Sequence, residues 1–260
     1  MAKRERMKPV RYNAGNMKWY RSALMILVTA MNRDVKEKAL ELFSDRVPPV
    51  DIVRHTLGEL ASKWLNRFTS RSPSLSNEMT DKTIASADRG LQQAAEKSGF
   101  KIKMQWTDAM QQKKDAIIAE NVSLIRSIPE KYFTEVEGMV YRSVAAGGDR
   151  KALADEIMSN FSKREGITRR RAEFIAKDQI RKATSALSAA RQQAAGITRG
   201  IWVHSAGQAN PRHKHVKADG QEFDLSKGLP VGDKGQYVMP GYEPNCSCSW
   251  RPVPPWEMKK

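Results

Sequence analysis

Apolar side chains recur every three or four positions over most of the first 196 residues, which is the period of an amphipathic helix. The first apolar stripe covers residues 20–42 and stops before Pro48. Asp51 is suited to cap a second helix, whose stripe extends over residues 53–68. We therefore expect residues 15–72 to form an N-terminal helical region.

The segment from Thr69 to Asn77 is rich in serine and contains Pro73, so it predicts a hinge. A helix should follow and end at Gly99, where glycine can adopt the left-handed conformation of a C-cap. Residues 100–106 alternate apolar and polar side chains, as a short strand or an extended link does. Residues 73–109 are accordingly interpreted as a hinge and linking helix.

Helical periodicity returns over residues 110–196, where Pro129 is expected to break it. Asp149 and Thr168 are suited to cap two further helices. Over residues 197–260, glycine and proline recur between short apolar pieces, which predicts a small β-rich or loop-rich C-terminal unit. The expected fold class is α+β, mainly helical.

The chain is strongly basic, with 45 Lys and Arg against 29 Asp and Glu, a net charge of +16. An excess of this size attracts polyanions, so we expect contact with the DNA backbone without reading of sequence. Residues 1–14 form a basic arm, flexible or bound to a partner. A solvated helix face or an acidic protein partner are the alternatives. The other candidate DNA-binding residues are Lys163, Arg164, Arg169, Arg170, Arg171, Arg181 and Lys182.

The sequence argues against a membrane segment and against a disulfide framework. Its best apolar run, residues 23–31, is far shorter than the about 20 apolar residues that span a bilayer. Its only cysteines are Cys246 and Cys248, which are separated by one residue. We therefore expect folding in a reducing cytoplasm.

The two cysteines, with His213 or His215, are candidate ligands of a zinc ion, because thiolate sulfur and imidazole nitrogen are the ligands of structural zinc sites. The set we favour is His215, Cys246 and Cys248. A loop-rich unit of this size has little core, and a metal would supply folding energy. The spacing is unusual, since paired zinc cysteines are normally separated by two to four residues. The alternative is a pair of half-buried cysteines in a turn, with histidines hydrogen-bonded nearby.

Catalytic motifs are absent from the sequence. There is no His-Glu-x-x-His helix, no phosphate-binding glycine loop and no serine elbow, so we expect no enzymatic activity. A metal-dependent nuclease or hydrolase acting on DNA is the alternative, and its candidate residues are His204, His213, His215 and Asp219. A polar turn containing Asp219 and Gly220 explains the same residues without chemistry.

Several separated motifs resemble one known family. They are NVSLIRSIP at residues 121–129, RAEFIAKDQ at 171–179, an Arg-x-x-His-x-x-x-Asp-Gly-x-x-Phe arrangement from Arg212 to Phe223, and a Pro-Gly-x-x-Pro-Asn-Cys-x-Cys ending at Cys248. Residues 110–253 are in these respects similar to the Mu F-like head morphogenesis proteins of tailed phages. The chain departs from the family at Asn210, commonly acidic, and at Ser247, commonly arginine.

The resemblance implies a minor head protein, present in few copies, that associates with the portal or inner capsid during head assembly. It implies a place in the virion head, and in the host cytoplasm during assembly. Some relatives are implicated in holding or escorting packaged DNA, and the family implies no established catalytic activity. We expect Arg212, Asp219 and Gly220 to be structural. A host nucleoid-like DNA-binding protein is a third interpretation of the charge.

Overall fold

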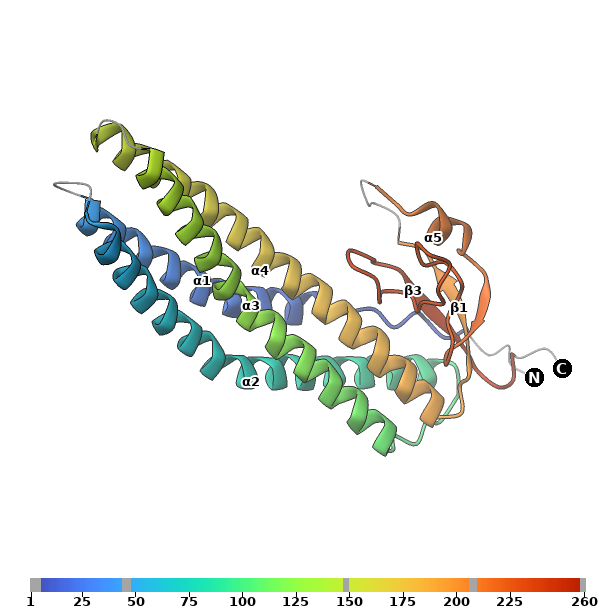
Figure 1. Ribbon diagram of the computed structural model, residues 1–260. Helices are drawn as coiled ribbons and strands as arrows, with labels where there is room; N and C mark the ends of the chain where they lie inside the picture. Colours follow the sequence, from blue (N-terminus) through green and yellow to red (C-terminus); the bar gives the residue numbers. More distant parts are fainter. Residues whose placement is uncertain (1–5, 44–47, 147–149, 206–209, 258–260) are drawn as a thin grey trace. The chain divides into compact units, whose positions relative to one another are not determined.

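The computed structural model describes residues 6–43, 48–146, 150–205 and 210–257. Four long helices come first, followed by a small sheet with a one-turn helix between two of its strands (Figure 1). This architecture confirms the expected α+β class, mainly helical. The elements are α1 (Ala14–Phe43), α2 (Val50–Lys97), α3 (Asp108–Ala146), α4 (Arg150–Ala194), β1 (Arg199–Val203), α5 (His213–Lys217), β2 (Glu222–Asp224) and β3 (Ser249–Val253).

The helix α2 runs through Pro73 without interruption, so residues 69–77 do not break the helix as predicted, although the two compact units divide within this segment, between Ser76 and Asn77. Proline lacks the N–H that would bond the carbonyl four residues earlier, which here is Thr69. The Ser72 hydroxyl donates a 3.0 Å hydrogen bond to that carbonyl and takes over the missing contact. The serines that suggested a loop therefore support the helix, and Ser72 and Ser76 are buried.

Two other predicted helix boundaries are also wrong. The helix α3 continues through Pro129, with Ile125, Ile128 and Tyr132 buried on either side of it. Burial on both sides of the proline opposes a break, because a kink would expose these side chains. The Thr168 hydroxyl donates to the carbonyl of Arg164 at 2.9 Å, within the continuous helix α4, and does not cap a helix. The predicted cap Asp149 lies outside the described residues.

The alternating segment 100–106 is an extended link without strand pairing, which decides between the two predicted alternatives. Phe100 packs edge-to-face against Trp256, with the ring centroids 4.8 Å apart. Ile102 is partly buried against the apolar cluster that contains Trp202 and Trp250. The alternation therefore reflects one-sided burial of a link.

The chain divides into two compact units, and each is assembled from separated segments. One unit comprises residues 19–76 and 120–176 and contains parts of all four long helices. Its described core is mostly apolar, and in it the buried Tyr20 hydroxyl donates to Asn121 Oδ1 at 2.7 Å. Its largest buried side chains include Tyr20, Leu24, Met31, Trp64, Phe68 and Ile125.

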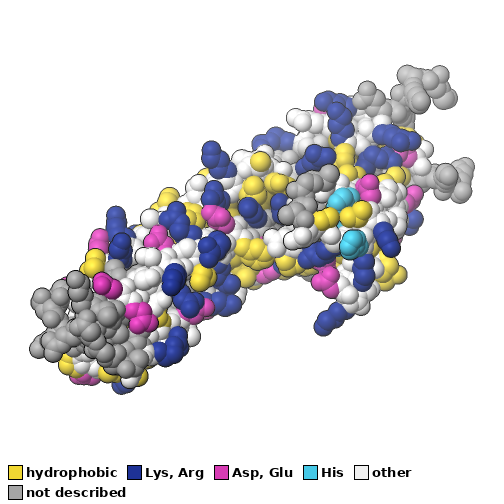
Figure 2. Space-filling view, turned by 90° about the horizontal axis from the view of Figure 1, so that it is seen from above, with side chains coloured by type: hydrophobic (Ala, Val, Ile, Leu, Met, Phe, Trp, Pro, Cys, Tyr) yellow, Lys and Arg dark blue, Asp and Glu magenta, His cyan; other side chains and the backbone are white. Residues whose placement is uncertain are grey.

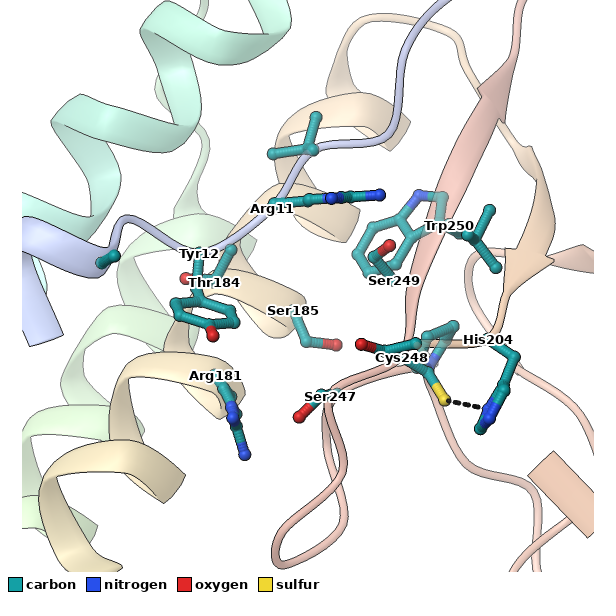
Figure 3. Close-up of a pocket in the computed structure, with 16 residues that line it drawn as sticks. Arg11, Tyr12, Arg181, Thr184, Ser185, His204, Ser247, Cys248, Ser249 and Trp250 are labelled. Atoms are coloured by element: carbon teal, nitrogen blue, oxygen red, sulfur yellow. Dashed lines mark hydrogen bonds between the residues drawn. The ribbon is translucent and has the colours of Figure 1, made fainter. Parts of the chain in front are cut away.

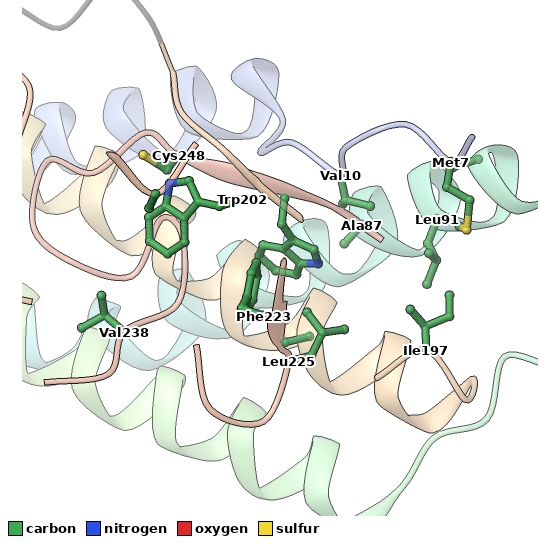
Figure 4. Packing of buried hydrophobic residues seen from close by; sticks show 14 of the residues in the cluster. Met7, Val10, Ala87, Leu91, Ile197, Trp202, Phe223, Leu225, Val238 and Cys248 are labelled. Atoms are coloured by element: carbon green, nitrogen blue, oxygen red, sulfur yellow. The ribbon is translucent and has the colours of Figure 1, made fainter. Parts of the chain in front are cut away.

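The other unit comprises residues 1–18, 77–119 and 177–260, and it holds the three strands. The strand order is β2-β1-β3, all antiparallel. Trp202, Phe223 and Trp250 pack edge-to-face at the centre of its core. Met7 and Val10 are buried in the same cluster (Figure 4), so the described part of the basic arm is anchored by its apolar side chains.

Candidate metal centre

Three side chains that are distant in sequence meet in the sheet-bearing unit. His215 lies on α5, and Cys246 and Cys248 lie on the segment that leads into β3. Their ligand atoms all lie within 4.8 Å of one another, and all three residues are buried. The His215 Nδ1 atom is 3.4 Å from the Cys246 sulfur and 3.9 Å from the Cys248 sulfur. The sequence prediction named these three residues, and the structure brings them together.

A fourth side chain, His204, reaches the same site from the end of β1. Its Nδ1 atom lies 3.6 Å from the Cys248 sulfur. The strand register explains this contact, because Val203 pairs with Ser249 and the next positions outward are His204 and Cys248. Opposed residues on antiparallel strands have their Cβ atoms only about 5 Å apart. The sheet therefore places this imidazole against the thiol.

The turn after α5 fixes both histidines relative to β1. The Asp219 carboxylate accepts the backbone N–H of His204 at 2.8 Å. The Gly220 N–H donates to the carbonyl of Trp202 at 2.9 Å, and Gly220 has φ +77°, a conformation that glycine adopts without strain. The Trp202 and His215 rings meet edge-on, with centroids 5.3 Å apart. Asp219 and Gly220 thus hold the scaffold of the site.

A tight turn shapes the cysteine segment. Gly241 has φ +79° and Asn245 has φ +60°, two left-handed positions separated by three residues. The Gly241 N–H donates to the Cys246 sulfur at 3.4 Å. The extended segment that follows turns Cys246 and Cys248 inward, whereas Ser247 between them is half-buried. The single-residue spacing therefore puts both sulfurs on one side of the chain.

The second nitrogen of His215 faces a carboxylate. Its Nε2 atom lies 3.0 Å from Glu243 Oε2, and both atoms are buried. The Arg212 guanidinium approaches the same carboxylate, Nε to Oε2, at 3.7 Å and donates to the Pro244 carbonyl at 3.1 Å. Arg212 thus contacts the cysteine-bearing turn, and Glu243 orients the histidine ring.

The titratable groups of the cluster perturb one another. The pKa of Cys246 is lowered, chiefly by its hydrogen bond with Cys248 and also by His215, against the effect of burial. The pKa of Cys248 is raised by the same Cys246 contact and by burial. The hydrogen bond with Cys246 raises the pKa of His215. The arrangement therefore favours a thiolate at Cys246, the form in which cysteine binds metal.

The remaining residues of the nuclease alternative do not join this cluster. His213 is exposed on α5, and the Asp219 carboxylate is engaged by a backbone N–H. Sequence reasoning had given His204 only a catalytic role and had missed Glu243. The signal for His204 is its position directly after the short apolar piece formed by residues 201–203, whereas nothing in the sequence pairs Glu243 with a histidine.

A cavity of about 260 Å³ adjoins the cysteine segment (Figure 3). The guanidinium groups of Arg11 and Arg181 line it, and no lining residue is acidic. Arg181 stacks over the Tyr12 ring at 5.2 Å, and its Nε atom and the Ser185 hydroxyl are buried without hydrogen-bond partners among the described residues. Guanidinium and hydroxyl donors of this kind can bind an anionic group such as a phosphate.

The predicted DNA-binding residues do not form one patch. Five of the seven are half-buried or engaged within the chain: Arg164 pairs with Glu135, Arg169 with Glu165, Arg171 with Ser127, Lys182 with Asp178, and Arg181 stacks on Tyr12. Lys163 and Arg170 are exposed. Figure 2 shows Lys and Arg side chains scattered over the visible face and interspersed with Asp and Glu. DNA binding stays a prediction.

Comparison with known proteins gives a family for this architecture. Residues 134–251 match the family model described as Phage Mu protein F like protein. A protein from Haemophilus influenzae, named only as an uncharacterized protein, is 28% identical over 268 residues, which cover 97% of this chain and 56% of that relative. No solved structure matches the chain. The matched segment contains all four side chains of the cluster, and over residues 134–251 the chain is similar to the phage Mu protein F-like family.

Proposed function

We propose that this chain is a minor head protein that takes part in head morphogenesis of a tailed phage. The observation that carries the proposal is the family match over residues 134–251, because it suggests a phage head morphogenesis protein. The cluster of buried thiols and imidazoles is consistent with a structural module. We infer a structural role, without enzymatic activity.

The partners we propose are the portal or inner capsid proteins, contacted by the helical unit of residues 19–76 and 120–176, which contains most of α1. Ile26 on this helix is 71% exposed and Leu40 is 51% exposed, which is unusual for large apolar side chains and suits a protein contact. The described helices include none long and apolar enough to cross a membrane. The proposed location is the virion head, and the host cytoplasm during assembly.

Deleting the gene in its phage tests this role. We expect few infectious, DNA-filled heads, and rescue by the wild-type gene supplied in trans. An Ile26→Glu variant should rescue poorly, whereas Tyr237→Glu, which changes another half-exposed apolar side chain in the other unit, should rescue fully. Normal yields of filled, infectious heads from the deletion strain would refute the proposal.

We further propose weak contact with DNA through backbone phosphates. The net charge of +16 and the exposed Lys163 and Arg170 support it, as does the basic cavity at Arg11 and Arg181. Binding of this kind weakens with salt, since log K falls by about 0.9 per phosphate contact per decade of salt concentration. Unrelated sequences should bind alike.

A salt titration with random duplex DNA measures this contact. The double variant Lys163→Ala, Arg170→Ala should flatten the salt dependence. The matched control Lys217→Ala, Lys234→Ala also removes two exposed charges, and should leave the dependence closer to wild type. No binding at low salt would overturn the DNA proposal.

Incubating the protein with plasmid DNA and divalent metals tests the nuclease alternative. Plasmid cleavage that His215→Ala abolishes would establish an enzyme.

A further inference from the structure

We propose that His204, His215, Cys246 and Cys248 bind one structural zinc ion. The inference rests on the geometry of these side chains and is independent of the proposed role in head assembly. It adds His204 to the three residues that the sequence indicated, and it gives Glu243 the role of orienting a ligand.

The distances between the four side chains fit a tetrahedral zinc site. Zinc binds sulfur at about 2.3 Å and imidazole nitrogen at about 2.0 Å, so a sulfur and a nitrogen on the same ion lie about 3.5 Å apart. Three sulfur–nitrogen distances, Cys246 to His215, Cys248 to His204 and Cys248 to His215, are 3.4, 3.6 and 3.9 Å. His204 lies outside the group whose ligand atoms are all within 4.8 Å of one another, so as fourth ligand its half-buried imidazole would have to turn toward Cys246.

The surroundings of His215 are those of a metal ligand. Both sulfurs lie near its Nδ1 atom, and its Nε2 atom faces Glu243 at 3.0 Å. A histidine bound to zinc normally donates its other N–H to a carboxylate, which fixes the ring and increases its basicity. The Gly241 N–H aimed at the Cys246 sulfur adds a donor that stabilises a thiolate. Two of the four proposed ligands, His215 and Cys246, thus have a supporting partner behind them.

The charge balance of the site favours a divalent ion. Two thiolates and two neutral imidazoles carry a charge of −2, which one zinc ion neutralises inside a buried cluster. Two sulfur and two nitrogen ligands in a tetrahedron are typical of zinc, and four protein ligands leave no position for substrate. The ion would join the end of β1, the helix α5 and the segment before β3.

The competing interpretation is a metal-free cluster in which thiols and imidazoles hydrogen-bond to one another. Metal analysis of protein purified without chelators separates the two. We expect about one zinc per chain in the wild type and loss of zinc in Cys246→Ser and Cys248→Ser. His204→Ala should bind zinc at least tenfold more weakly. The matched control is His213→Ala, an exposed histidine two residues from His215 on the same helix, and it should keep the full complement.

Cobalt substitution gives a readout on the unaltered chain, should a cysteine variant fail to fold. Cobalt(II) added to metal-free wild-type protein should give the thiolate charge-transfer and intense visible bands of a tetrahedral site, and zinc should displace them. Glu243→Gln should keep these bands but weaken zinc binding by about 10- to 100-fold. Wild-type protein that neither retains zinc nor shows these bands overturns the proposal. Full affinity in His204→Ala removes this residue from the ligand set.

Discussion

The ion pair between Asp88 on α2 and Arg191 on α4 offers the sharpest test of packing in the sheet-bearing unit. The Arg191 side chain is only 7% exposed, and it donates to both carboxylate oxygens of Asp88, at 2.7 and 2.6 Å. It also donates to the Gln105 carbonyl and lies over the Trp106 ring. A single guanidinium therefore joins two helices and the link between α2 and α3.

Replacing Asp88 by Asn keeps the shape of the side chain but leaves a buried cation without its counter-charge. Breaking a buried pair on one side costs about 3–5 kcal/mol. The Asp88 side chain is 26% exposed, so water recovers part of this, and we expect a loss of about 2–3 kcal/mol. For a protein of this size the loss lowers the melting temperature by roughly 4–12 °C.

The matched control is Glu222→Gln, which breaks the exposed pair between Arg199 and Glu222 in the same unit. Both side chains are more than 40% exposed there, so the change should cost less than about 1 kcal/mol. Urea unfolding followed by tryptophan fluorescence and circular dichroism compares the two variants. Equal and small losses of unfolding free energy in both variants would refute the reasoning. Burial would then have no effect on how much an ion pair contributes to stability. The double variant Asp88→Leu, Arg191→Met should be more stable than Asp88→Asn, because it leaves no unpaired charge.

Three further changes test other parts of the fold. Gly200→Ala puts a methyl group 2.7 Å from the Trp250 ring and should destabilise the sheet by about 1–3 kcal/mol. An unchanged midpoint of urea unfolding would contradict this close contact. Tyr20→Phe leaves a buried Asn121 oxygen without its donor and should cost about 1–3 kcal/mol, and a neutral effect would argue against this hydrogen bond. Pro73 lies at an exposed position inside α2, and Pro73→Ala should raise the melting temperature because it restores a helical N–H. A lower melting temperature would favour a functional hinge.

The sequence by itself determined the class of the fold and three of the four residues of the thiol and imidazole cluster. Periodicity of apolar positions requires only local geometry, so the helical character of most of the first 196 residues and the change of character after residue 196 could be predicted. The alternation of a Cys-Ser-Cys segment likewise places both sulfurs on one side of an extended chain. His215, Cys246 and Cys248 could therefore be grouped, although nothing local showed how close they lie.

Only the tertiary structure decided where the helices continue and what completes the cluster. Pro73 and Pro129 carry strong local signals for a break, but burial on both sides and the Ser72 hydrogen bond outweigh them. His204 joins the cysteines because two strands pair across about 45 residues of chain, and Glu243 faces His215 because a turn folds back on α5. Contacts between distant segments depend on strand register and packing, and these are properties of the whole folded unit that no local pattern encodes.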